Sequence, residues 1–250
     1  MNVNAKVQNL RISQKYFFSI KKKVRTNYWF KKKDPDGKLR NRILDFEKEK
    51  NFFKRNNQSL IKIINSLNPQ SVLDVGCGPG FLLSILKKKN IKVVGVEVDK
   101  VAAKKAQEFA KVYISDLNKK FNFAGKFQLV IAYHVIEHLK NPTLFIKKIK
   151  KLISKGGYLI IGTPDFDSCM SRLFKNNYRM LHDKTHISLF STESITRLLI
   201  DNKFSVKKID YPFFDTNYFT KKNLLRMFNR RKISPPFYGN FMTIVAKKIN

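Results

Sequence analysis

From residue 70 onward, short runs rich in β-branched residues alternate with segments of helical periodicity, and this alternation constrains the fold more than any other feature. Five runs are typical of strands and lie at 71–75, 91–98, 111–115, 127–133 and 157–163. Helical patterns separate them at 81–89, 101–110 and 141–153. Apolar runs that are buried on both faces and joined by helices specify a mainly parallel sheet with crossover connections. We therefore predict a doubly wound α/β domain over 70–250.

The C-terminal part continues this pattern with longer interruptions. Residues 191–202 are typical of a helix, and 204–210 and 241–247 are typical of strands. The connections at 164–190 and 211–240 are too long for simple turns, and long connections in a compact domain are usually functional loops. We expect both connections to shape a substrate site.

Residues 1–69 precede the alternating pattern and carry no motif that indicates a function. Apolar residues recur at helical spacing from Ile43 to Ile64, and Asn68–Pro69 ends that pattern. The DPDG stretch at 34–37 is a strong turn signal, because proline presets φ and glycine tolerates positive φ. We predict a basic, helical N-terminal extension or lid over 1–69.

The charge of the chain is strongly positive. It holds 51 Lys and Arg residues against 18 Asp and Glu residues, a formal net charge of +33. A field of this sign attracts nucleic acid, anionic lipid or acidic substrates. Residues 1–33 hold ten basic residues and no acidic one, which favours a docking role for the ends of the chain. A lysine-rich composition produced by AT-rich coding is the alternative explanation, and the sequence leaves both open.

Neither a membrane span nor a secretion signal is indicated. The sequence has no apolar run of about eighteen residues, the length that a helix needs to cross a bilayer, and its N-terminus lacks the apolar core of a signal peptide. Cys77 and Cys169 are too few for a disulfide framework or a zinc cluster. We expect a cytoplasmic protein, with peripheral attachment to a membrane as a further option.

A glycine-rich turn follows the first strand. VLDVGCGPGF places Gly76, Gly78 and Gly80 between that strand and a helix, where glycine permits a tight turn and a close approach of the backbone to a ligand. Glu97 ends the next strand, 21 positions after Gly76, the spacing at which a carboxylate can accept both hydroxyls of a ribose. A dinucleotide fingerprint would need a third glycine where Phe81 stands. The combination predicts a nucleoside-containing cofactor at this turn.

Several segments stand in an order that is typical of one enzyme family: DVGCGPG, then SDL at 115–117, FQLVIAYHVIEHL and LISKGGYLIIGTP. Together they resemble the class I S-adenosylmethionine-dependent methyltransferases. HISLFSTESITRLLIDNKFSV further resembles the ubiquinone-type and glycan-cluster group. The resemblance implies a Rossmann-like sheet of seven strands, mostly parallel with an antiparallel last strand. It also implies S-adenosylmethionine as the cofactor and methyl transfer as the activity.

The resemblance assigns cofactor contacts to the positions that match these motifs. Glu97 matches the acidic residue that binds the cofactor ribose, Asp116 the residue that faces the adenine amine, and Leu117 the residue that packs on the adenine ring. The cofactor-binding residues expected on this basis are Asp74, Gly76, Cys77, Gly78, Gly80, Glu97, Val98, Asp116, Leu117 and Tyr133. Asp74 and Glu97 also give the cleft the negative charge that suits a sulfonium cation.

The four histidines form two pairs, each four residues apart. His134 and His138 follow the fourth predicted strand, and His182 and His186 lie in the long connection after the fifth. Ligands of an open parallel sheet bind beyond the carboxyl ends of its strands. Both pairs are therefore predicted to lie at the same rim, beside the reactive methyl group.

Three roles are open to these histidines. A histidine with a pKa near neutrality suits a general base that removes a proton from a hydroxyl, and we favour His138 and His186 for this role. His134 is a further candidate, and Asp183 could orient them. Histidines four apart with Glu137 adjacent could instead bind a metal ion, or the histidines could be structural and hold the loop. We predict no metal site.

The acceptor has to be inferred from the flanks of the domain. The Asn/Asp-Pro-Pro-aromatic motif of base N-methyltransferases is missing after the fourth strand, and neither cysteine is placed to attack a cytosine. These features disfavour RNA, although the lysines and aromatics of 15–33 would suit it. We predict methyl transfer, with oxygen favoured, to a small-molecule, glycan or lipid-like acceptor, and an anionic membrane surface as a partner. RNA methylation and non-catalytic S-adenosylmethionine binding are the alternatives.

Overall fold

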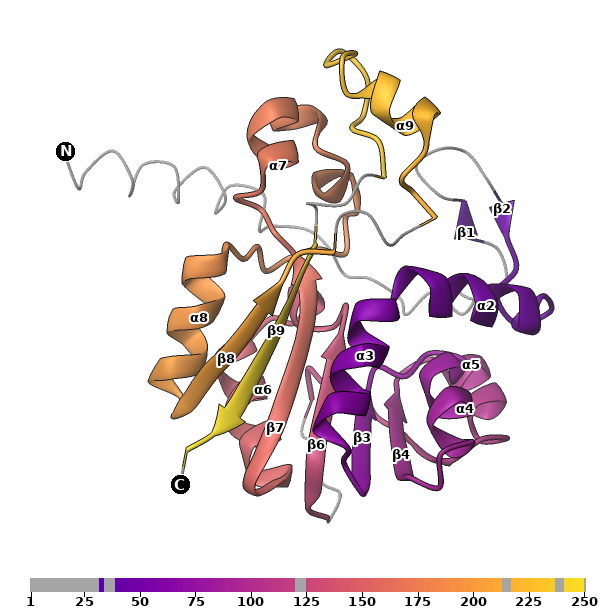
Figure 1. Cartoon of the computed structure of the whole chain (residues 1–250), viewed down its shortest axis with the longest axis vertical. Coiled ribbons are helices and arrows are strands. Elements are labelled where there is room, and N and C mark those ends of the chain that lie inside the picture. The colour runs from indigo at the N-terminus through magenta and orange to yellow at the C-terminus, as the bar shows by residue number, and fades with distance from the viewer. Residues whose placement is uncertain (1–31, 34–38, 120–124, 213–216, 237–240, 250) are drawn as a thin grey trace.

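The computed structural model describes residues 32–33, 39–119, 125–212, 217–236 and 241–249. At its centre is a seven-stranded sheet with the order β5-β4-β3-β6-β7-β9-β8 (Figure 1). The strands are β3 Ser71–Val75, β4 Lys92–Glu97, β5 Lys111–Ile114, β6 Phe127–Tyr133, β7 Ile153–Pro164, β8 Phe204–Asp210 and β9 Phe241–Lys248. Neighbours from β5 to β7 are parallel, whereas β9 is antiparallel to both β7 and β8. The predicted sheet and its antiparallel last strand are confirmed.

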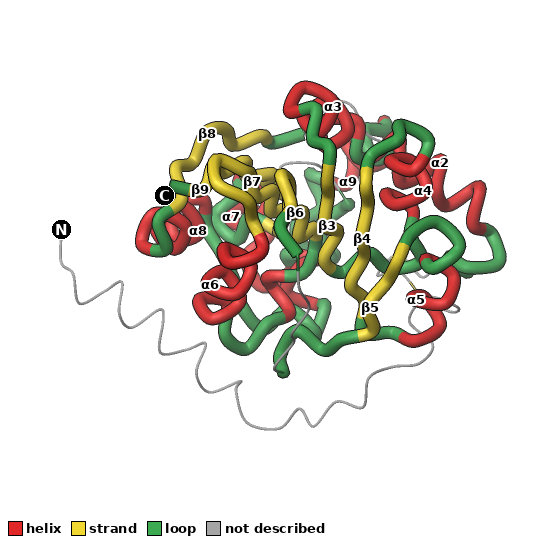
Figure 2. The backbone as a smooth tube through the Cα atoms, turned by 90° about the horizontal axis from the view of Figure 1, so that it is seen from below, coloured by secondary structure: helices red, strands yellow, loops and turns green. Residues whose placement is uncertain are grey.

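Helices cover both faces of this sheet. They are α3 Gln58–Leu67, α4 Phe81–Lys87, α5 Lys100–Ala106, α6 Pro142–Leu152 and α8 Thr192–Asp201. Figure 2 shows α3 and α6 on opposite sides of the row of strands. Val72 and Ile131 belong to the apolar cluster that includes α3 and α4, whereas Leu73 and Val130 belong to the cluster that includes α6 and α8. Burial on both faces explains why the strands appear in the sequence as unbroken apolar runs.

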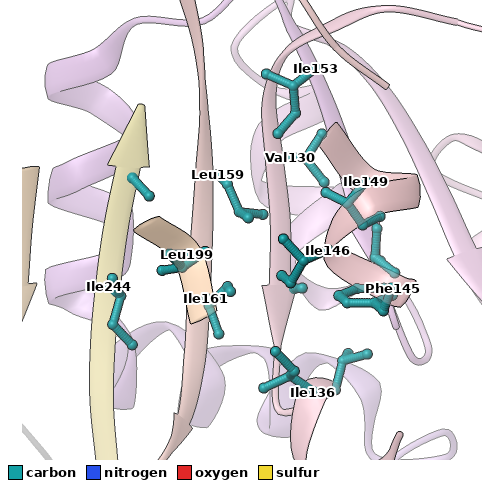
Figure 3. Packing of buried hydrophobic residues seen from close by; sticks show 14 of the residues in the cluster. Val130, Ile136, Phe145, Ile146, Ile149, Ile153, Leu159, Ile161, Leu199 and Ile244 are labelled. Carbon is teal, nitrogen blue, oxygen red and sulfur yellow. The ribbon is translucent and has the colours of Figure 1, made fainter. Parts of the chain in front are cut away.

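The larger cluster fixes α6 and α8 on the sheet. Ile146 of α6, Leu199 of α8 and Ile161 of β7 are fully buried, and Figure 3 shows their side chains between these elements. Each such side chain contributes about 1.5–3 kcal/mol when it leaves water. The predicted start of α6 is also observed, because the side chain of Asn141 accepts a hydrogen bond from the N–H of Leu144 at 2.9 Å.

The first described residues form a small antiparallel ladder that the sequence pattern does not indicate. β1 Lys32–Lys33 pairs with β2 Leu39–Arg40. The predicted turn at 34–37 and the basic stretch 1–31 lie outside the described residues, as do 213–216 and 237–240 of the second predicted loop. The pairing of β1 with β2 joins two separate segments, and helical periodicity in the sequence carries no information about such pairing.

The helical pattern that follows forms two helices. Asn57 separates α2 Phe46–Asn56 from α3, and the side-chain amide of Asn57 donates to the carbonyl of Phe53 at 2.8 Å. Leu60 and Ile64 of α3 are buried in the sheet core. This helix of the 1–69 segment therefore forms one layer of the α/β domain.

Two long connections lie at the carboxyl ends of the parallel strands. The first holds α7 Cys169–Phe174 and the short helices η2 Lys175–Asn177 and η3 Arg179–His182, and the second holds α9 Lys221–Arg226. Figure 1 shows α7 and α9 beyond the arrowhead of β7. Both connections border the sheet edge at which ligands of this fold class bind. Among the described residues, no helix combines the length and apolarity needed to span a bilayer.

Candidate active site

The glycine turn after β3 passes very close to neighbouring elements. Gly76 and Gly80 have positive φ angles of 77° and 90°. The N–H of Gly76 donates to the carbonyl of Val96 at 2.8 Å, which holds the turn against β4. A Cβ atom at Gly76 would lie 2.5 Å from Val135 Cγ2, and one at Gly80 would lie 2.9 Å from the Cα atom of Ala106. Glycine is required at both positions for its conformation and for its size.

Glu97 at the end of β4 is buried and holds this turn in place. Its Oε2 accepts from the N–H of Gly78 at 2.8 Å, and its Oε1 accepts from the N–H groups of Val98 at 2.8 Å and Asp99 at 2.9 Å. Burial raises the pKa of this carboxyl, although the three backbone donors oppose the rise. A carboxylate offers about four lone-pair sites, so a ribose hydroxyl would have to use the remaining site or replace a backbone donor. Ribose binding by Glu97 stays a prediction.

Asp74 in β3 is a second buried carboxyl at this edge. Burial, together with the charge of Glu97, raises the pKa of Asp74 from 3.8 to about 7. Two buried carboxylates repel one another, and a cationic ligand would relieve that repulsion. Burial and these two charges also raise the pKa of the Cys77 thiol, so this cysteine is a neutral packing group. The carboxylates and the glycine turn together fit the sulfonium nucleoside S-adenosylmethionine.

The remaining predicted cofactor residues differ in their surroundings. Asp116 and Leu117 follow β5, and Leu117 packs against the larger apolar cluster. Val98 is exposed directly after β4. Tyr133 belongs to the packing of the sheet, because its hydroxyl forms a 2.7 Å hydrogen bond with Thr243 Oγ1 and burial raises its pKa to about 12. The order β5-β4-β3 places the first three near the glycine turn, and their cofactor contacts remain expectations.

Glu137 lies among the histidines that follow β6. It is fully buried, its Oε2 accepts from Thr163 Oγ1 at 3.1 Å, and its Oε1 lies 3.4 Å from Nδ1 of His134. Burial alone would raise the pKa of this carboxyl, but His134, His138 and His186 outweigh burial and lower it. The site therefore contains an ionised, buried carboxylate together with three imidazoles.

His138 and His186 come from two different connections and lie side by side, with 5.0 Å between their ring centroids. Nδ1 of His138 bonds the carbonyl of Thr185, and Nδ1 of His186 bonds the carbonyl of Met180, each at 2.9 Å. Because a carbonyl oxygen can only accept, both Nδ1 atoms carry a proton, and in the neutral rings Nε2 holds the lone pair. Burial, opposed by the nearby carboxylates, lowers the pKa of His186. In each neutral ring Nε2 is therefore the atom that can accept a proton.

His182 and Asp183 form hydrogen bonds within the connection that carries His186. Nε2 of His182 bonds the carbonyl of Asn176 at 3.1 Å, and the side chain is exposed. Oδ1 of Asp183 accepts from the N–H and the hydroxyl of Thr185, at 3.0 and 2.6 Å. Since the carbonyl of Thr185 bonds His138, Asp183 shapes the loop that orients this histidine.

The described residues contain one group of acidic, histidine or cysteine side chains that is compact enough to hold a metal ion. The ligand atoms of Glu137, His138 and His186 lie within 4.8 Å of one another. Two imidazole nitrogens and one carboxylate oxygen suit a first-row divalent metal. The sequence-based expectation of no metal site therefore remains to be tested at this group.

Three residues of the site were not predicted as such from the sequence. Glu137 was considered only as a neighbour of His138, and neither Thr163 nor Phe241 was expected at the site. Thr163 lies near the end of the buried strand β7, and a polar residue within the apolar run IIGTP could have marked it as a site residue. Phe241 begins β9, and its ring packs edge-on against His134 with 4.9 Å between centroids. No local signal marks Phe241, because the contact depends on the insertion of β9 beside β7.

Comparison with known proteins agrees with this geometry. The sequence matches the methyltransferase domain family over residues 35–209. The ubiquinone biosynthesis O-methyltransferase of Bradyrhizobium diazoefficiens is 26% identical over 166 residues, which cover 62% of this chain and 64% of that protein. Ajmaline N-methyltransferase of Rauvolfia serpentina is 31% identical over 103 residues, 37% of this chain and 35% of that protein. The chain thus spans less than two thirds of the length of these relatives.

A solved structure shows the same fold. The S-adenosylmethionine-dependent methyltransferase of Thermotoga maritima superimposes with a TM-score of 0.60 and 21% identity, over 83% of this chain and 97% of that chain. The family match covers well over half of the sequence. The chain therefore belongs to the class I S-adenosylmethionine-dependent methyltransferases.

Proposed function

We propose that this methyltransferase moves a methyl group from S-adenosylmethionine to an oxygen atom of a small-molecule, glycan or lipid-like acceptor. The observation that carries the proposal is the pair His138 and His186, whose Nδ1 atoms bond carbonyl groups and whose Nε2 atoms remain to take a proton. An acceptor hydroxyl has to lose its proton, and a neutral imidazole is suited to take it. The likeness to a ubiquinone O-methyltransferase supports oxygen as the target atom.

The carboxylates beside the glycine turn would hold the cofactor. When bound, S-adenosylmethionine supplies a methyl group on a sulfonium, which is already a good leaving group, so alignment of the acceptor is the main requirement. Asp74 and Glu97 are both buried, and their negative charge would favour a bound cation. In this proposal the connections at 164–190 and 211–240 would cover the acceptor and exclude water.

Glu137 would stabilise the imidazolium that forms when a histidine takes the proton. Its charge acts on His134, His138 and His186, and such interactions are strong where water is excluded. The hydroxyl of Thr163 donates to Oε2, which fixes the orientation of the carboxylate. In this proposal Glu137 and Thr163 position the histidines, and the histidines take the proton.

A nitrogen acceptor is the second candidate, and the likeness to ajmaline N-methyltransferase favours it. A neutral amine already has a lone pair and can lose its proton after the transfer. Loss of the histidine base should therefore slow N-methylation much less than O-methylation.

Substitution of the two histidines tests the base. In His186→Asn and His138→Asn the amide can still donate to the carbonyl that Nδ1 now bonds, while the basic Nε2 is removed. We expect turnover to fall by about 10²–10⁴-fold with little change in cofactor affinity. Turnover that survives in the Asn variants but falls in the Ala variants would assign both histidines a structural role instead.

The acceptor class is tested by incubating the protein with methyl-labelled S-adenosylmethionine and a cell extract. The extract is then separated into RNA, lipid, polysaccharide and small-molecule fractions. Label in any of the last three supports the proposal. Label in RNA that is lost with ribonuclease would replace it with RNA methylation. Cofactor binding without transfer to any fraction would indicate a non-catalytic binding protein.

A further inference from the structure

The connection between β8 and β9 contains a segment in which exposed apolar side chains alternate with cations. Residues 217–233 hold six basic residues and no acidic one. Leu225 and Phe228 are 61% and 86% exposed, and Phe228 is the most exposed large apolar side chain in the described part of the chain. The basic residues are Lys221, Lys222, Arg226, Arg230, Arg231 and Lys232. Exposed apolar side chains that are grouped together and surrounded by polar residues are typical of an interaction surface.

This segment is held in a defined position. Met227 packs against the apolar cluster that includes Met170 and Tyr178. The side-chain amide of Asn177 donates to the carbonyl of Arg230 at 2.9 Å. These contacts fix the inner side of the segment, so the exposure of Leu225 and Phe228 on α9 and just after it is a property of the fold.

The same anchor connects the segment to the rim of the active site. The N–H of Ser234 donates to the carbonyl of Asn177 at 2.8 Å, and the N–H of Arg179 donates to Ser234 Oγ at 3.0 Å. Asn177 and Arg179 belong to the connection that also carries His186. Figure 1 shows α9 and α7 together beyond the strand ends. A surface that binds 217–233 would therefore lie beside the connection that carries His186.

We propose that residues 217–233 dock the protein on the surface of an anionic phospholipid bilayer. Leu225 and Phe228 would enter the boundary between headgroups and acyl chains while the surrounding lysines and arginines contact anionic headgroups. The charge of the segment is complementary to such a surface. The aromatic ring of Phe228 could stack on a base, but Leu224 and Leu225 are aliphatic and exposed and cannot stack in this way, so the segment suits lipid better than RNA.

Docking at this position would give a lipid-like acceptor a route from the bilayer to the active site. This consequence rests on the proposed function, whereas the docking itself does not. The docking itself can be measured without cofactor or acceptor. A failure to bind vesicles would leave the methyl-transfer proposal unaffected, and a failure of methyl transfer would leave the docking proposal unaffected.

The test is flotation of the full chain with vesicles of phosphatidylcholine alone or mixed with phosphatidylglycerol. We expect binding to the mixed vesicles only, and binding that weakens as salt is raised. The double variant Leu225→Asp with Phe228→Asp should bind at least about tenfold more weakly. The control is Leu44→Asp with Ile200→Asp, which makes the same change in charge at two other exposed apolar residues, 77% and 55% exposed, and should bind like the wild type.

Three results would overturn the proposal. They are equal losses in the two double variants, vesicle binding that does not depend on Leu225 and Phe228, and binding to RNA without binding to vesicles. Circular dichroism and S-adenosylmethionine binding verify that each variant is folded, because Leu225 and Phe228 lie outside the cofactor site. If the Asp variant is unfolded, Leu225→Ser with Phe228→Ser keeps the test available.

Discussion

The substitution Asp74→Asn should stabilise the ligand-free protein at high pH. Burial and the charge of Glu97 raise the pKa of Asp74 from 3.8 to about 7. A carboxyl with a higher pKa in the folded chain than in the unfolded chain binds more protons when folded, so stability falls as pH rises between these two values. At 1.36 kcal/mol per pH unit, ionised Asp74 lowers the free energy of unfolding by about 4 kcal/mol above pH 7. Asparagine has nearly the same shape and does not ionise.

Thermal unfolding, followed by circular dichroism near pH 4 and near pH 8, measures this difference. About 1 kcal/mol changes the melting temperature by about 2–4 °C in a protein of this size. We therefore expect Asp74→Asn to melt about 10 °C above the wild type at the higher pH and close to it at the lower pH. Asp201→Asn, at an exposed position on α8, is the control and should change stability by less than about 0.5 kcal/mol at either pH.

The same variant should bind S-adenosylmethionine at least about tenfold more weakly by calorimetry, because a buried negative charge beside the cation is lost. In the wild type, affinity should rise with pH up to about 7 as Asp74 becomes ionised. If Asp74→Asn has the same melting temperature as the wild type at both pH values, ionisation of Asp74 does not lower the stability of the folded protein. The electrostatic account of these two buried carboxyls would then be refuted.

Three further outcomes are expected. Glu97→Ala should weaken cofactor binding and lower the free energy of unfolding by about 1–3 kcal/mol in urea titrations, because the N–H of Gly78 and its neighbours lose their acceptor. Gly76→Ala should destabilise the fold by about 1–3 kcal/mol in the same assay, since the new methyl group meets Val135 Cγ2 at 2.5 Å. The acid limb of the pH–rate profile should lie below pH 6.5, because burial lowers the pKa of His186; a limb at higher pH would exclude His186 as the base.

Much of the fold could be predicted because it depends on local patterns. The bounds of β3 and β6 agree with the predicted runs at 71–75 and 127–133, since strands buried on both faces are continuous apolar sequences. β7 begins at Ile153, earlier than the predicted 157. Ile153 pairs with Phe127 of β6, the next pair is Tyr158 with Leu129, and the register is irregular between them. Long-range pairing of this kind leaves no periodic signal.

The active site divides in the same way. The sequence by itself determined the glycine turn, the carboxylate at the end of β4 and the rim on which the histidines lie, because the parallel direction of the strands follows from the alternation of strands and helices. Only the tertiary structure decided that Glu137 is buried among three imidazoles and that backbone carbonyls fix the tautomers of His138 and His186. The bond of His138 to the carbonyl of Thr185 joins residues 47 positions apart, and a carbonyl acceptor has no side chain by which a sequence could reveal it.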